Sequence, residues 1–202
     1  MNANLEFSKK EYELITNSDF ILTKNRIIEK MYSLYGMLSE KYKNVLNENV
    51  ACLPNEIFKI APKIYKGEQY KNLPYVLLDY PRCFSKTDVF AVRSFFWWGN
   101  YFSITLQLSG KYLKTYAQHV FNFLNNEQNA DWFFGVNEHA WEHHFEESNY
   151  MLFNEIKNIT VADFKQRQFI KIASKLPLEK WEIVEEFYLQ HYKKLIEMLC
   201  RN

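Results

Sequence analysis

Hydrophobic positions in the first fifty residues recur at steps of three and four, which is the spacing of one face of an α-helix. Ser18 and Asp19 are suitable N-cap residues ahead of this pattern. The pattern predicts that residues 1–50 are helical, with a short helix near residues 9–15 followed by a long one. The apolar stripe of the long helix consists of Ile21, Ile27, Ile28, Met31, Leu34, Tyr35, Leu38, Tyr42 and Val45.

From residue 57 the pattern changes to short apolar or alternating runs, which are typical of β-strands. Two such runs, 57–65 and 73–81, are separated by the polar loop KGEQYKN. The strongest pair, DVFAVRSFFWW and YFSITLQLS, follows over residues 88–109. The sheet is therefore predicted over most of residues 57–110.

The last third of the chain predicts more helices around further strands. Residues 111–126 carry a helical stripe, and residues 131–173 read mostly as sheet, with a short helix before a strand at 169–173. A C-terminal helix is predicted over residues 178–200. Its inward side chains are predicted to be Trp181, Val184, Tyr188, Leu195 and Leu199.

This order of elements is typical of an α+β fold. The length of 202 residues suits one domain, residues 1–202, with a mainly antiparallel sheet and the long N- and C-terminal helices packed on one face. The aromatic content is high, with 17 Phe, 14 Tyr and 5 Trp, so a substantial core is easy to build.

The dipeptide Gly99-Asn100 lies between the strongest pair of strands. Gly at the first position suits a two-residue type II′ hairpin, which would pair Trp98 with Tyr101 and Trp97 with Phe102. One face would then carry Val89, Ala91, Arg93, Phe95, Trp97, Phe102, Ile104, Leu106 and Leu108. We expect the helices to cover that face, because it is the more apolar one.

The opposite face of this hairpin mixes rings with hydroxyls and an amide. Rings provide contact area and polar groups provide orientation, so this face is a candidate ligand surface, although a loop or second layer could simply cover it. Its candidate ligand-binding residues are Phe96, Trp98, Tyr101, Ser103, Thr105 and Gln107.

Arg93 stands among apolar neighbours in this pattern. A buried arginine needs a carboxylate or carbonyl groups around it. Asp79 on the neighbouring predicted strand is the natural partner, so we expect a structural ion pair rather than a substrate clamp.

The segment NEHAWEHHFEE contains the spacing H-x-x-E-H, read as His139, Glu142 and His143. On a helix this spacing would place both histidines at a zinc ion, with Glu142 as base. The aromatic run before it favours a strand instead, and a strand points Glu142 away from the two histidines. We therefore expect no zinc or other cofactor; the alternative is a metal-assisted hydrolase that also uses His144.

The charge balance and the cysteines indicate which partners and which cellular location to expect. Lys plus Arg is 25 and Asp plus Glu is 24, so the near-neutral chain predicts no nucleic-acid partner. Neither a signal peptide, a basic amphipathic segment nor a membrane-spanning run is apparent, so no membrane partner is expected. Cys52, Cys83 and Cys200 are scattered, which predicts reduced thiols and a cytoplasmic location.

The stretches LPYVLLDYPRCFSK and FFWWGNYFSITLQLSG resemble conserved hypothetical bacterial proteins without an assigned function. The resemblance implies a bacterial cytoplasmic setting and no particular reaction. Taken together, the sequence predicts a non-catalytic domain that binds a small molecule or a protein through an aromatic sheet face. The alternatives are the metal-assisted enzyme and single-stranded nucleic-acid binding, in which rings stack on bases.

Overall fold

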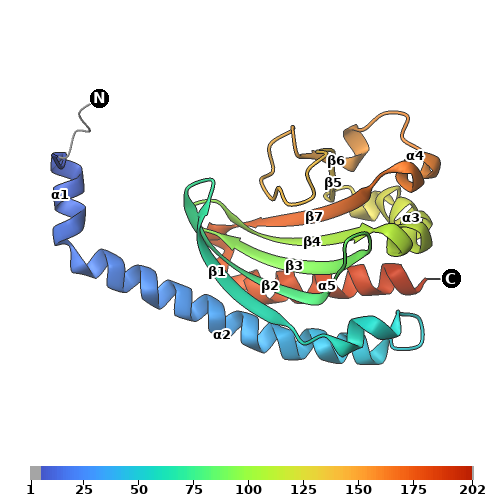
Figure 1. Ribbon diagram of the computed structural model, residues 1–202, viewed down its shortest axis with the longest axis horizontal. Helices are drawn as coiled ribbons and strands as arrows, with labels where there is room; N and C mark the ends of the chain where they lie inside the picture. Colours follow the sequence, from blue (N-terminus) through green and yellow to red (C-terminus); the bar gives the residue numbers. More distant parts are fainter. Residues whose placement is uncertain (1–5, 202) are drawn as a thin grey trace.

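The computed structural model describes residues 6–201 and shows one α+β domain built on a seven-stranded antiparallel sheet (Figure 1). The strand order is β1-β2-β3-β4-β7-β5-β6. The strands are β1 (Lys63–Tyr70), β2 (Leu73–Phe84), β3 (Val89–Trp97), β4 (Tyr101–Ser109), β5 (Phe133–Gly135), β6 (Tyr150–Leu152) and β7 (Phe169–Pro177).

Two long helices, α2 and α5, run side by side across one face of this sheet, and α3 packs beside them (Figure 1). The α-helices are α1 (Lys9–Thr16), α2 (Ser18–Glu48), α3 (Gly110–Leu124), α4 (Val161–Gln166) and α5 (Val184–Cys200). Short 3₁₀ helices are η1 (Asn55–Lys59), η2 (Glu127–Asn129), η3 (Phe153–Glu155) and η4 (Leu178–Ile183). The predicted fold class is confirmed.

The start of α2 differs slightly from the expected one. Asn17, not Ser18 or Asp19, is the N-cap, and its side chain accepts a hydrogen bond from the Phe20 amide. Asp19 lies in the first turn, where its charge favours the helix dipole. The predicted apolar stripe is buried from Ile28 to Val45 and faces the sheet, but its first member, Ile21, is exposed.

The predicted hairpin register is wrong by one residue. Trp97, not Trp98, lies opposite Tyr101, and Phe96 lies opposite Phe102. The loop has three residues, because the Trp98 amide donates to the Pro74 carbonyl of β2 and Gly99 takes a φ of 70° in the middle of the loop. Since side chains alternate along a strand, this single step changes which residues of β3 share a face with those of β4.

The helix-covered face therefore differs from the expected one. Phe90, Val92 and Phe96 of β3 join Phe102, Ile104, Leu106 and Leu108 of β4 in the main core. Arg93, Phe95 and Trp97 lie on the other face instead. Arg93 is still buried, so the prediction names the wrong face of the sheet for Arg93 but the right degree of burial.

Three further predictions need correction. The strand predicted over residues 57–65 begins only at Lys63, and the chain before it forms the 3₁₀ helix η1 up to Lys59. The predicted loop 66–72 is mostly strand, because β1 continues to Tyr70 and only Lys71 and Asn72, both with positive φ, form the turn. Trp181 is 42% exposed rather than inward. It belongs to the 3₁₀ helix η4, which is broken at Lys180, so the helical phase of α5 does not extend back to it.

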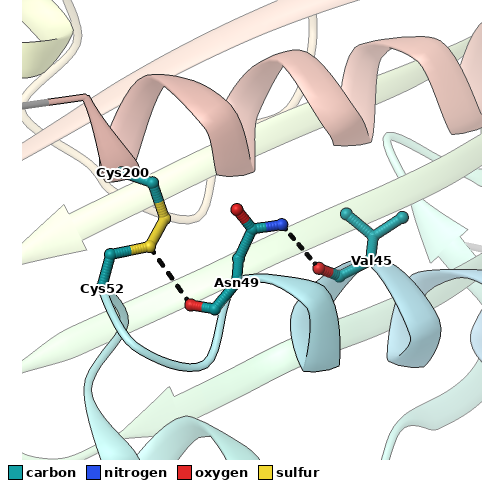
Figure 2. The surroundings of a disulfide bond; sticks show 4 residues. All are labelled: Val45, Asn49, Cys52 and Cys200. Atoms are coloured by element: carbon teal, nitrogen blue, oxygen red, sulfur yellow. Dashed lines mark hydrogen bonds between the residues drawn. A yellow bond between two sulfur atoms is a disulfide. The ribbon is translucent and has the colours of Figure 1, made fainter.

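A disulfide bond joins Cys52, in the turn after α2, to Cys200 at the end of α5 (Figure 2). The prediction of three reduced thiols is therefore wrong for this pair, and Cys83 is the free cysteine of the described residues. The two cysteines are separated by 148 positions in the sequence, so no short spacing could reveal the pair. The same turn is tied to α2 because the Asn49 side chain donates to the Val45 carbonyl at 2.8 Å.

We expect the Cys52–Cys200 bond to contribute strongly to stability. A cross-link across so long a loop restricts the unfolded chain by about 4–5 kcal/mol in the chain-entropy model. The double variant Cys52→Ser/Cys200→Ser should melt roughly 10 °C below the wild type in calorimetry without reductant. Wild type in reductant should match the variant, and coincident melting of oxidised and reduced wild type would contradict the expectation.

Candidate functional site

The sheet face that points away from the helices carries a second, separate aromatic cluster. Leu77, Phe95 and Trp97 form its buried centre. Rings and aliphatic groups from β1, β2 and β4 surround them: Tyr65, Tyr70, Leu73, Tyr75 and Tyr101. Gly67 on β1 leaves room for the Tyr75 ring, since a Cβ at this position would lie 2.5 Å from that ring and would displace it.

A segment without helix or strand structure, residues 136–149, lies over this face and is called the covering segment below. Its Trp141 ring lies 5.8 Å from that of Phe84 at the end of β2, and its Phe145 ring lies 5.1 Å from that of Tyr101. The sheet thus has helices on one face and irregular backbone on the other.

The predicted strand over residues 137–147 is wrong, and so is the helix that the zinc alternative requires. The chain leaves the sheet after Gly135, and the Asn137 side chain fixes the departure. Its Oδ1 accepts from the His139 amide at 2.7 Å, and its Nδ2 donates to the Ser148 carbonyl. A local turn of this kind competes with the sheet for backbone hydrogen bonds.

Arg93 is the polar centre of the face. Its Nε and Nη2 each lie 2.7 Å from a carboxylate oxygen of Asp79, which is a bidentate ion pair. Nη2 also donates to the Tyr65 hydroxyl at 3.2 Å. Its Nη1 lies 2.8 Å from Nε2 of His143 in the covering segment.

The His143 ring packs against two aromatic rings of the sheet. The His143 ring centroid lies 5.6 Å from that of Tyr70 and 5.2 Å from that of Phe95, and this position is called the seat below. Because a guanidinium only donates, Nε2 must be the unprotonated, accepting nitrogen. Burial, and then the positive charges of Arg93 and Lys171, hold the pKa of His143 well below its usual value, so the ring is neutral.

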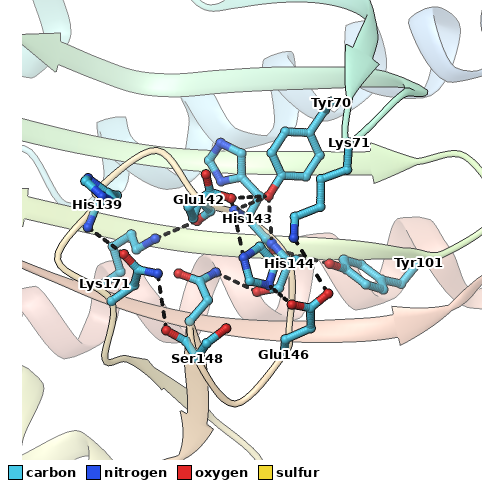
Figure 3. A network of polar contacts seen from close by, with 12 residues as sticks. Tyr70, Lys71, Tyr101, His139, Glu142, His143, His144, Glu146, Ser148 and Lys171 are labelled. Atoms are coloured by element: carbon cyan, nitrogen blue, oxygen red, sulfur yellow. Dashed lines mark hydrogen bonds and ion pairs between the residues drawn. The ribbon is translucent and has the colours of Figure 1, made fainter.

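Three side chains from the sheet hold the backbone of the covering segment (Figure 3). The Tyr70 hydroxyl accepts from the amides of His143 and His144 at 2.7 and 3.0 Å. The Tyr101 hydroxyl donates to the His143 carbonyl at 3.2 Å, and Lys171 Nζ donates to the Glu142 carbonyl at 2.6 Å. The sheet therefore binds residues 142–144 much as it could bind a separate polar molecule.

Burial shifts the pKa values of Lys171 and Tyr70 but leaves the charge of both side chains at neutral pH unchanged. Lys171 has no exposed surface, and burial lowers the pKa of its amine to about 8 against a smaller opposing effect of Glu142. Burial raises the pKa of Tyr70 to about 12, so its hydroxyl is neutral and can donate to the Glu142 carboxylate at 3.1 Å. Neutral tyrosines and a cationic lysine are suited to hydrogen-bonding a ligand.

The structure separates the residues of the zinc alternative. His139 is exposed at the surface, while His143 points to Arg93. His144 is buried between the carboxylates of Glu142 and Glu146, each 3.4 Å from one of its ring nitrogens. No group of three or more potential ligands within residues 6–201 has the geometry to hold a metal ion.

The predicted ligand-binding residues fall on both sides of the sheet. Tyr101, Ser103, Thr105 and Gln107 lie on the covered aromatic face with Arg93. Phe96 does not, because it is part of the core under the helices. Trp98 lies in the hairpin loop, against the same core.

The sequence pattern marks none of Tyr70, Tyr65 and Lys171 as a site residue. Tyr70 belongs to the predicted loop 66–72, and Lys171 has Phe169, Ile170 and Ile172 as neighbours in a predicted strand. A lysine inside an apolar strand is unusual, since lysine is rarely buried without a partner, and that signal could have marked Lys171.

No protein-family model, curated protein or solved structure matches the chain. The resemblance to conserved bacterial proteins therefore stays a prediction. None of the helices within residues 6–201 combines the length and apolar composition that crossing a bilayer requires.

We expect Arg93→Leu alone to lower the free energy of unfolding by about 3–5 kcal/mol, because it leaves the buried Asp79 carboxylate unpaired. The double variant Arg93→Leu/Asp79→Leu should recover much of this loss. Denaturant unfolding of both single variants and the double variant measures the coupling. Additive losses would show that the two side chains do not act as a pair.

Acid should weaken the fold through His143. The unfolded chain protonates this histidine near pH 6.5, whereas the folded chain keeps it neutral well below that pH. The unfolded state then binds more protons, so the free energy of unfolding falls as the pH drops below about 6.5. The melting temperature of His143→Gln, which keeps an acceptor for Arg93, should therefore fall less than that of wild type between about pH 7.5 and pH 5.

His144 and His191, whose pKa values burial also lowers, are present in both proteins, so their contributions cancel in this comparison. Parallel melting curves over the whole pH range would contradict the assignment to His143.

Proposed function

We propose that the protein is a non-catalytic domain that binds a small molecule on its aromatic sheet face. The ligand has a planar ring with a hydrogen-bond acceptor and takes the seat that the His143 ring occupies. The observation that carries the proposal is this ring, which lies against Tyr70 and Phe95 with its Nε2 2.8 Å from Arg93.

The chemistry of the face supports this kind of ligand. Ring side chains supply contact area, and Arg93 supplies a donor whose direction is fixed by Asp79. Trp97 is buried, and its indole N–H has no hydrogen-bond partner among the described residues. A bound polar molecule could satisfy it, which would remove the cost of a buried unpaired donor.

The covering segment is suited to exchange with a ligand. Glu138, His139, Trp141 and residues 146–148 are exposed, so the segment is a single layer over the face. Arg93, Tyr70, Tyr101 and Lys171 would lose partners if it simply left. In an open form of the protein, the covering segment has left the sheet face. A ligand that makes those contacts in its place binds the open form more tightly and so shifts the equilibrium toward it.

The alternative functions have weaker support. The metal-assisted reaction lacks its helix, and a nucleic-acid strand would need both an uncovered face and a basic surface. The cytoplasmic location stays a prediction, and the Cys52–Cys200 bond is more typical of an oxidising compartment.

Chemical rescue of His143→Gly tests the proposal. The variant leaves an aromatic seat with the Arg93 donor unfilled, so millimolar imidazole should raise its melting temperature. An excess of about ten times the dissociation constant corresponds to about 1.4 kcal/mol, or roughly 3 °C.

Two controls make the rescue specific. His139→Gly removes an exposed histidine, and imidazole should leave its melting temperature unchanged. Pyrrole has the same ring size without an accepting nitrogen, and it should stabilise His143→Gly less than imidazole does. Equal effects of imidazole on both variants would reject the proposed seat.

A further inference from the structure

The N-terminal part of the chain forms an arm, residues 6–26, that consists of α1 and the start of α2. Figure 1 shows this arm projecting away from the sheet and from α5. Every residue from 6 to 23 is exposed, and the first buried side chain of α2 is Ile28. The arm is nevertheless regular, since Ser8 and Glu11 form a capping box at the start of α1.

The exposed arm is unusually apolar. Seven large side chains along it are 42–66% exposed: Phe7, Tyr12, Leu14, Ile15, Phe20, Ile21 and Leu22. Phe20 and Ile21 lie seven residues before Ile27 and Ile28, so the stripe that packs on the domain continues beyond it. A stripe of this kind normally has a surface to cover it.

An apolar groove of about 460 Å³ begins where the arm meets the domain. It is lined mainly by Ile27, Phe96, Trp98, Phe102, Leu178 and Trp181. Ile27 of α2 lines the groove, so the groove adjoins the exposed apolar side chains at the start of α2. Because α2 is a single helix from Ser18 to Glu48, the part of the arm that belongs to α2 cannot fold back onto the groove of its own chain.

The size of the arm matches what a stable dimer requires. An aromatic side chain has about 150–250 Å² of surface and an aliphatic one somewhat less, so the seven half-exposed side chains expose on the order of 600 Å² per copy. A standard interface buries about 800 Å² per partner, and the groove supplies the rest.

The charge of the arm argues against a lipid surface. Residues 6–26 carry four acidic side chains and four basic ones, a balance of zero. A helix that lies on an anionic membrane has an excess of basic residues on its polar face. The arm is therefore better matched to a neutral apolar protein surface.

We propose that a second copy of this chain is the occupant, with the arm of each copy packed in the groove of the other. The two contacts are related by a twofold axis, so each copy contributes the same arm and the same groove. This interface lies on the helix side of the sheet, apart from the ligand face, and does not depend on the proposed function.

Analytical ultracentrifugation of the full chain tests this proposal. Wild type should sediment as a dimer, at twice the 24.5 kDa of one chain, at micromolar concentration. Ile15→Glu in the arm and Trp181→Ala in the groove should each weaken dimerisation at least tenfold. Val50→Glu is the matched control, because Val50 is equally exposed but lies past the other end of α2, and it should leave the dimer unchanged.

Mixing the two defective chains identifies the arm-in-groove arrangement. The Trp181→Ala chain has an intact arm and the Ile15→Glu chain has an intact groove, so the mixture should dimerise more tightly than either chain alone. Circular dichroism confirms that each variant is folded. A monomeric wild type, or a dimer that only the arm variant weakens, overturns the proposal.

Discussion

The guanidinium of Arg93 is surrounded by aromatic side chains and makes hydrogen bonds to three residues from separate parts of the chain. A cation in such a place must have its donors satisfied, or its burial would be prohibitively costly. Asp79 of β2 neutralises it, and Tyr65 of β1 takes a further donor. The remaining Nη1 requires an acceptor from above the sheet, and His143 provides it.

This requirement accounts for the form of the covering segment. Its apolar contacts at Trp141 and Phe145 lie at its sides, whereas polar groups of the sheet hold its middle. Hydrogen bonds exchanged with a ligand cost little if the ligand makes the same bonds. A hydrophobic cover would be harder to exchange, so the polar attachment of residues 142–144 is what makes the aromatic face a candidate binding surface.

The two ends of the domain are stabilised in different ways. The Cys52–Cys200 bond joins the far end of α2 to the end of α5, where both helices also pack on the sheet. The N-terminal end of α2 has no cross-link of this kind and is part of the exposed arm. A covalent bond restricts the unfolded chain, whereas the arm gains stability only when another surface covers it.

The sequence by itself determined the classes of the longest helices and of the central strands, together with most of their apolar stripes. Helical spacing located α2, α3 and α5, alternation located β3 and β4, and Asp79 was selected as the partner of Arg93 because a buried arginine needs a carboxylate. Only the tertiary structure decided the face on which that pair lies, since the Trp98 amide bonds to β2 and lengthens the hairpin loop by one residue. It also decided the path of residues 136–149 and the pairing of Cys52 with Cys200. These features depend on partners far away in the chain, and local periodicity carries no information about them.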